Sequence, residues 1–177
     1  MSPFMRKHQK ITRVGMIITL SVMIDQITKY VAVLQLQDHN TISVLGDFLT
    51  LNLHINRALA FNAMTSILDM QFIITLNVIV CMMLIRHIAL AVNTMQYIGL
   101  TLICSGGLGN LVDRIAYHGV IDFIALYALP LKQPYIWHIF DKSFTIYPVC
   151  IFNIADVIAV IGLVLYIFSQ YKHRYNL

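Results

Sequence analysis

The sequence predicts an all-α membrane protein with four transmembrane helices, a small extracytoplasmic β-sheet and an interfacial loop, organised as a single domain over residues 1–177. Its composition is the first observation: 59% of the residues are hydrophobic and only 11% are charged, whereas soluble domains carry about 25% charged residues. The second is a set of four apolar windows, each close to the roughly 20 residues that a spanning helix needs. These windows are Val14–Val33, Ile67–Ala91, Met95–Tyr117 and Val149–Phe168.

The positions of Lys and Arg predict the orientation, because short cytoplasmic flanks are enriched in these residues. Seven of them lie beside the window ends that share one side of the membrane when the chain crosses four times: Arg6, Lys7, Lys10, Arg13, Arg86, Lys172 and Arg174. We therefore expect both termini in the cytoplasm. The first window follows a basic N-terminus, as the apolar part of a signal peptide does, but its length and its Asp25 and Lys29 predict a retained helix.

Two segments between the windows are expected outside the membrane. Leu49–Asn56 alternates apolar and polar residues, which predicts a half-buried strand. Thr41–Leu45 can pair with it through a turn at Gly46-Asp47, giving a small sheet on the outer bilayer surface. The second segment, His118–Pro148, mixes aromatic residues with prolines and is predicted to form the interfacial loop.

Ionisable residues inside the apolar windows require an explanation, because each costs about 2.5 to 3.5 kcal/mol to insert. With cytoplasmic termini, Asp25 lies in the outer half of the first window, Asp113 near the outer end of the third, and Asp156 in the outer half of the fourth. At 1.5 Å per residue, Asp156 is expected about 10 Å below the outer boundary. Asp122 follows just outside the third window, so four carboxylates are expected at a similar depth.

The spacing of basic residues divides these aspartates by role. Lys29 is four residues after Asp25, so the two share a helix face and are expected to form a supporting ion pair. Asp113 and Arg114 are adjacent, so on a helix each faces a different neighbour. Asp122 and Asp156 have no such nearby basic residue, and we interpret them as the functional pair.

Amides and glycines accompany the carboxylates. Asn110 is one turn before Asp113, and Asn153 is three residues before Asp156, so we expect it on the same helix face. Such amides can orient a carboxylate or form interhelical hydrogen bonds. The run that contains Gly106, Gly107 and Gly109 predicts close helix packing.

Four short motifs in order carry a resemblance to a known family. They are Asp25-Gln-Ile-Thr-Lys29; Asn56 ahead of Ala60-Phe61; Gly107-Leu-Gly-Asn110-Leu-Val-Asp113-Arg114 with Val120-Ile-Asp122-Phe123; and Phe152-Asn153-Ile-Ala-Asp156. Together with the four-window layout they resemble bacterial lipoprotein signal peptidase, or signal peptidase II. The resemblance extends from about Asp25 to Asp156.

The resemblance implies an intramembrane aspartic endopeptidase of the bacterial inner membrane. Such an enzyme removes signal peptides from diacylglyceryl-modified prolipoproteins by cutting before the lipidated Cys. Carried over by motif, the catalytic residues fall on Asp122 and Asp156. The residues implied to line the site, hold substrate or support it are Asn56, Asn110, Asp113, Arg114, Asn153, Asp25 and Lys29.

The chain departs from the family pattern in two places. Arg57-Ala58-Leu59 stands where the family usually has a Gly and a small residue, which predicts an altered loop or a narrower groove. In addition, 33 residues separate Asp122 from Asp156, and the extra length around Ala128–Pro148 predicts an enlarged flap beside the site.

Several other classes of function are disfavoured or left open by the residues. No HExxH or GxSxG motif and no CxxC pair occurs, so we expect no metal or cofactor. The basic residues form no aromatic-interleaved stripe for nucleic acid, so the expected partners are lipidated precursors and membrane lipids, with the protein as a monomer. A proton-coupled transporter, or an inactive relative that binds lipoproteins, remains an alternative.

Overall fold

The computed structural model describes residues 3–37, 40–46, 48–57, 67–127, 135–139, 142–146 and 149–174. The chain folds into two compact units. The helical unit comprises Met1–Thr28, Asn56–Val120 and Ile154–Leu177, and the sheet unit comprises Lys29–Ile55 and Ile121–Asn153. The organisation of both units as one membrane domain stays a prediction.

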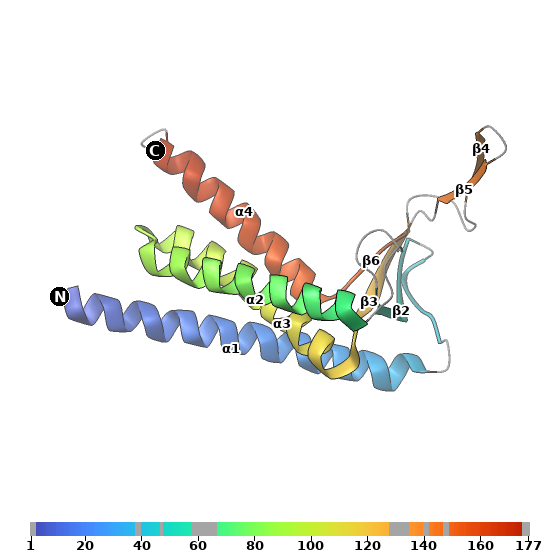
Figure 1. The fold of residues 1–177 in the computed structure, drawn as a ribbon, viewed down its shortest axis with the longest axis horizontal. Helices are drawn as coiled ribbons and strands as arrows, with labels where there is room; N and C mark the ends of the chain where they lie inside the picture. The colour runs from blue at the N-terminus through green and yellow to red at the C-terminus, as the bar shows by residue number, and fades with distance from the viewer. Residues whose placement is uncertain are drawn as a thin grey trace. The chain divides into compact units, whose positions relative to one another are not determined.

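Four long helices make up most of the described chain (Figure 1): α1 Pro3–Leu36, α2 Ile67–Leu90, α3 Thr94–Tyr117 and α4 Ile154–Arg174. Among the described residues, three stretches are long and apolar enough to cross a membrane: His8–Leu36, Met70–Leu90 and Ile154–Lys172. They lie in α1, α2 and α4. Of the four predicted spans, these three have the composition that a crossing requires.

Helix α3 has the length of a span but is not one of these three stretches. It contains 24 residues, among them Asn110, Asp113 and Arg114, and it packs against both α2 and α4. A helix enclosed by other helices can carry polar groups that a lipid-facing helix cannot, because its neighbours supply their hydrogen bonds. The fourth membrane crossing therefore stays a prediction.

Local signals fix both ends of α3. Asn93 precedes it with extended backbone, and its side-chain oxygen accepts a hydrogen bond from Gln96 N at 2.7 Å, an N-cap that satisfies one of the free amides of the first turn. His118 ends the helix with a left-handed backbone, φ 52°, the conformation that commonly follows a last helical turn.

Glycines bring α3 and α4 close together. A Cβ atom added to Gly99 would lie 2.8 Å from the carbonyl oxygen of Gly162, and one added to Gly162 would lie 2.6 Å from that of Gly99. A Cβ on Gly106 would overlap the carbonyl oxygen of Ala155. Small residues let the two backbones approach, as in membrane helix pairs generally.

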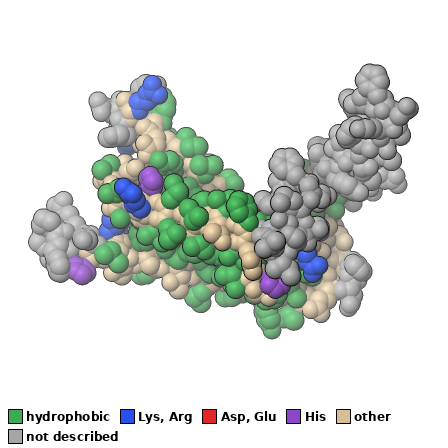
Figure 2. Space-filling model, viewed as in Figure 1, with side chains coloured by type: hydrophobic (Ala, Val, Ile, Leu, Met, Phe, Trp, Pro, Cys, Tyr) green, Lys and Arg blue, Asp and Glu red, His purple; other side chains and the backbone are tan. Residues whose placement is uncertain are grey.

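The outer surface of the helices is apolar. Large hydrophobic side chains stay exposed along α1, α2 and α4, including Leu20, Phe72 and Val164, and hydrophobic atoms cover much of the helical unit on the face shown in Figure 2. Such a surface is typical of helices that face lipid rather than water. Within the helical unit, the start of α1, the α2–α3 connection and the end of α4 lie at the same end (Figure 1).

The sheet has four strands in the order β1-β2-β3-β6. They are β1 Ile42–Leu45, β2 Leu49–Asn56, β3 Val120–Tyr127 and β6 Val149–Phe152, and β1 pairs with β2, and β3 with β6, in antiparallel register. The predicted strand Leu49–Asn56 is confirmed with the same bounds, and the turn before it has Gly46 at a positive φ of 52°, which glycine adopts without strain. Tyr127 N donates to Phe48 O at 2.9 Å and links β3 to this hairpin.

Two predictions about the later segments were wrong. The predicted interfacial loop contains β3 and an antiparallel pair, β4 Tyr135–Ile139 and β5 Lys142–Ile146. The fourth window does not begin a helix at Val149, because Val149–Phe152 is β6, paired with β3, and α4 begins only at Ile154. A short apolar run fits a strand or a helix equally well, and here the neighbouring strand decides.

Candidate active site

In the sheet unit, Asp122 and Asn153 form a buried hydrogen-bonded pair. Asp122 lies in β3 and is 3% exposed, while Asn153 directly follows β6 and is fully buried. Because Ile124 pairs with Phe152 in the β3–β6 register, the residue after β6 reaches Asp122. Asn153 Nδ2 donates to Asp122 Oδ1 at 2.7 Å, a bond that orients the carboxylate.

In the helical unit, Asp156 and Asn110 form a second carboxylate–amide pair. Asp156 lies in the first turn of α4 and is half-buried, where the helix dipole favours a negative charge. Asn110 of α3 donates from Nδ2 to Asp156 Oδ1 at 2.9 Å. Because α4 begins at Ile154, Asp156 is the third residue of the helix, and its depth in the membrane stays a prediction.

Each amide donates to a carboxylate on another element of the fold. We expected Asn153 to share a helix face with Asp156, which was wrong because Asn153 precedes α4 and its side chain is bonded to Asp122. Asn110 bonds across to Asp156 of α4. Asp122 and Asp156 lie in different units, and their pairing stays a prediction.

Asp25 satisfies the first turn of α4. Its side chain is 1% exposed, and Oδ1 accepts a hydrogen bond from Ala155 N at 2.9 Å. This amide is one of those that a helix N-terminus leaves without an intrahelical partner. A Cβ on Gly109 would lie 2.6 Å from Asp25 Oδ2, so glycine at this position of α3 makes room for the carboxylate. Asp25 thereby holds the turn that carries Asp156.

Gln26 connects α1 to α3 and was not singled out by the sequence. Its side-chain nitrogen lies 2.9 Å from Asp113 Oδ1, 3.1 Å from Asp25 Oδ2 and 3.2 Å from Gly109 O. The two N–H groups of one amide thus serve three acceptors, two of which belong to buried carboxyl groups. The sequence does contain a signal for this role, because a side-chain amide inside an apolar helix and next to Asp25 is expected to form interhelical hydrogen bonds.

The remaining predicted site residues are Asp113, Arg114, Lys29 and Asn56. Asp113 is fully buried, and Arg114 donates from Nη1 to Asn110 O at 3.3 Å on its own helix. Lys29 is 1% exposed one turn after Asp25, and its ion pair with Asp25 stays a prediction. Asn56 is the last residue of β2 and is exposed, while Ala58–Phe61 of its motif lie outside the described residues.

The residues that the structure describes hold neither a candidate metal site nor a disulfide. Nowhere in the described part of the chain do three or more His, Cys or Asp side chains gather in a way that could hold a metal ion. Cys81, Cys104 and Cys150 are free thiols.

The chain matches a known family over most of its length. The family model for signal peptidase (SPase) II matches residues 17–172. The chain belongs to the signal peptidase II family. Two solved structures, both of bacterial membrane enzymes determined by the in meso method, are similar to it. The first has a TM-score of 0.73 and 26% identity, and the match covers 94% of this chain and 92% of that chain. The second has a TM-score of 0.72 and 25% identity, and the match covers 92% of this chain and 94% of that chain.

Curated members of the family are similar over a shorter stretch. A lipoprotein signal peptidase of Clostridium tetani is 44% identical over 70 residues, 40% of this chain and 35% of that protein. One from Pasteurella multocida is 37% identical over 83 residues, 46% of this chain and 40% of that protein. The matched region thus spans only about two fifths of the curated relatives' length.

Proposed function

We propose that this chain is an aspartic endopeptidase that removes the signal peptide from diacylglyceryl-modified prolipoproteins and cuts before the lipidated Cys. Membership of the signal peptidase II family carries the proposal. The two candidate carboxylates add chemical support, because Asp122 and Asp156 each accept a hydrogen bond from an Asn amide. A carboxyl group oriented by a neutral amide donor is suited to general acid–base chemistry.

Chain connectivity supports a joint role for the two aspartates. Asn153, which holds Asp122, is three residues from Asp156. The family resemblance assigns the catalytic roles to these same two aspartates.

The proposed mechanism needs only the two carboxyl groups and water. Two carboxylates held close together resist joint ionisation and share one proton. The ionised member takes a proton from water as the water attacks the scissile carbonyl carbon, and the protonated member donates to the carbonyl oxygen. Collapse of the tetrahedral intermediate then returns a proton to the leaving amine.

The Asn amides have a definable part in this scheme. Asn110 and Asn153 each donate one N–H to Oδ1 of their aspartate, which helps to orient the carboxyl group. Asp25 holds the first turn of α4 through Ala155 N. These three residues position the reacting groups rather than take part in proton transfer.

We further propose a membrane topology with four crossings, in which α3 is the fourth span and both termini are cytoplasmic in the bacterial inner membrane. The start of α1, the α2–α3 connection and the end of α4 lie at the same end of the helical unit, and this arrangement supports the topology. The first turn of α4, with Asp156, then lies toward the outer face, where a lipid-anchored precursor can enter sideways from the bilayer. We expect a monomer surrounded by membrane lipids.

Cleavage of a purified lipidated precursor, followed by gel shift, tests the proposal. We expect wild-type protein to cut it, and Asp122→Asn and Asp156→Asn each to lower the rate by about 10² to 10⁴ while remaining folded in detergent. Substantial cleavage by either variant would remove that aspartate from the dyad. A wild-type protein that retains the precursor without cutting would indicate an inactive relative, and one that neither binds nor cuts would favour a transporter.

A further inference from the structure

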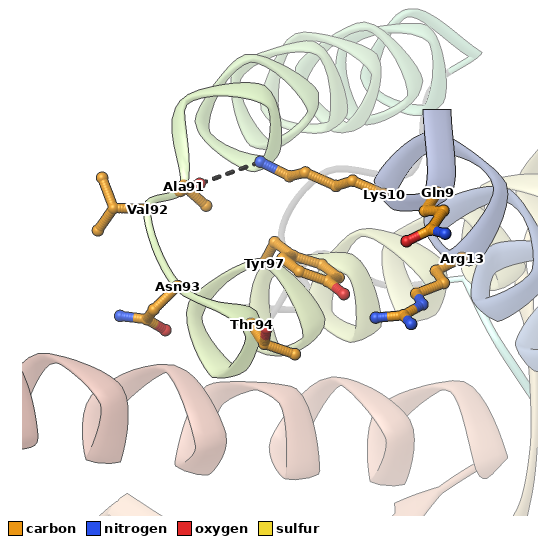
Figure 3. A pocket seen from close by; sticks show the side chains of 8 residues that line it. All are labelled: Gln9, Lys10, Arg13, Ala91, Val92, Asn93, Thr94 and Tyr97. Carbon is orange, nitrogen blue, oxygen red and sulfur yellow. Dashed lines mark hydrogen bonds between the residues drawn. The ribbon is translucent and has the colours of Figure 1, made fainter. Parts of the chain in front are cut away.

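A cavity of about 370 Å³ lies in the helical unit, apart from the carboxylate–amide pairs. Its lining comes from the start of α1, the α2–α3 connection and the first turn of α3: Gln9, Lys10, Arg13, Ala91, Val92, Asn93, Thr94 and Tyr97. Figure 3 shows the α1 side chains projecting toward the connection. Tyr97 precedes Asn110 by 13 residues on α3, so the cavity is about 20 Å along the helix from the Asn110–Asp156 pair.

Lys10 is held rigidly at this cavity. Its Nζ donates to Ala89 O at 3.1 Å and to Ala91 O at 3.0 Å, and it lies 5.4 Å from the centroid of the Tyr97 ring. These contacts satisfy carbonyls at the C-terminal end of α2 and add a cation–π interaction. An ammonium group has three N–H donors, so the two bonds leave one for a ligand.

Arg13 provides the second positive charge, and its donors are uncommitted within the described ranges. Its side chain is exposed, and no hydrogen bond or ion pair to it is found in that part of the chain. In Figure 3 its guanidinium points toward Thr94 and Tyr97 at the start of α3. A guanidinium presents five N–H groups in a fork that matches two oxygens of one oxyanion.

The surroundings favour an anion. None of the eight lining residues is acidic, and α3 begins at the cavity, so its helix dipole adds positive potential there. The site thus combines two cationic side chains, an amide side chain from Gln9 and a tyrosine. Its volume falls within the range of small-molecule sites.

Neighbouring apolar residues distinguish a lipid phosphate from a free one. The cavity lies at the ends of two candidate spans, His8–Leu36 and Met70–Leu90. Ile11, Leu90 and Val92 are 59%, 67% and 79% exposed beside it. A phospholipid could place its phosphate in the cationic cavity and its acyl chains along this apolar surface. Basic pockets between membrane helices bind anionic headgroups in this way.

We propose that this cavity binds the phosphate of an anionic phospholipid, with Arg13 as its main ligand and Lys10 as a fixed second charge. The site is independent of the aspartate chemistry. With the proposed topology it faces the cytoplasmic leaflet, and its occupant would tie α1 to the α2–α3 connection.

Lipid binding to purified full-length protein, measured by native mass spectrometry and thermal unfolding in detergent, tests the proposal. We expect phosphatidylglycerol to bind and raise the unfolding temperature more than phosphatidylcholine does. Arg13→Gln should weaken phosphatidylglycerol binding by about tenfold, the effect of losing one charge-assisted contact, and Arg13→Lys should restore part of it. Arg13 makes no structural bond among the described residues, so the variant should fold.

Arg86→Gln is the matched control, because Arg86 is an exposed arginine of α2 outside the cavity. An equal loss of phosphatidylglycerol in this variant, or no loss in Arg13→Gln, would overturn the site. Equal binding of phosphatidylcholine would also overturn it. If millimolar inorganic phosphate displaces phosphatidylglycerol and protects the protein equally, the ligand is a small free anion and the lipid assignment fails.

Discussion

The C-terminal end of α3 lies among carboxyl groups, and its N-terminal end lies beside Lys10 and Arg13. At the first end, Asn110, Asp113 and Gly109 are packed against side chains of α1 and α4, with hydrogen bonds of 2.9 to 3.2 Å. At the second end, a cavity of about 370 Å³ separates α1 from the start of α3. One helix thus joins a closely packed polar network to an open cationic site.

This difference has a physical reason. A buried carboxyl group without donors is costly, so the network around Asp25 and Asp113 has to be closed by Gln26 and by the backbone of α4. Lysine and arginine at a membrane boundary can stay solvated, so the opposite end tolerates an open space. We therefore expect substitutions at the polar end to affect folding or turnover, and those at the cationic end to affect lipid binding.

Within the polar end, Asp156 and Asp113 should respond differently to the same change. Asp156→Asn should lower cleavage by about 10² to 10⁴ because it removes proton transfer, with unfolding temperature nearly unchanged. Asp113→Asn keeps an oxygen that can accept from Gln26, so cleavage should stay within about tenfold. Rates and thermal unfolding of both purified variants give the comparison, and similar rates for the two would abolish the distinction between catalytic and supporting carboxylates.

The close approach of α3 to α4 gives the next largest effect. Gly106→Ala places a Cβ against the Ala155 carbonyl oxygen, and we expect a loss of about 1 to 3 kcal/mol in the free energy of unfolding. Gly107 is the matched control, because its added Cβ would lie 3.5 Å from Cys81 Sγ, an ordinary separation. Reversible denaturation in detergent measures both, and an equal loss at Gly107 would show that helix backbone effects, not packing, explain the result.

Removing the amide that joins two carboxyl groups should destabilise the polar end. Gln26→Leu leaves Asp25 and Asp113 without this donor, which we expect to cost about 1 to 3 kcal/mol. Gln35→Leu, at an exposed position of the same helix, controls for the gain in hydrophobicity. Thermal unfolding of the two variants decides the matter, and equal stability would remove Gln26 from the network.

Arg114 should have the smallest effect and one that depends on the substrate. Its guanidinium donates to Asn110 O at 3.3 Å, and the planar fork of a guanidinium matches the oxygens of a lipid phosphate or carbonyl. Arg114→Lys should slow cleavage of the lipidated precursor by about tenfold and spare an unlipidated peptide. A loss of the same size on both substrates would instead indicate a partner of Asp113 or a membrane anchor.

The sequence by itself determined most of the helical framework and the set of reactive residues. Ile67–Ala91 and Met95–Tyr117 match α2 and α3 to within one residue at each end, and β2 has the predicted bounds. These elements were predictable because long apolar runs and strict alternation are local properties of the chain. Carboxylates inside apolar windows were visible for the same reason.

Only the tertiary structure decided how those residues are partnered. Val149–Phe152 is a strand because β3 offers it hydrogen bonds. As a result α4 begins only at Ile154, so Asn153 precedes the helix and Asp156 lies in its first turn. The donors to Asp122 and Asp156 come from other elements of the fold, and Gln26 acquires its role only where α1 crosses α3. Hydrogen-bond partners across elements depend on register and crossing geometry, which no local pattern encodes.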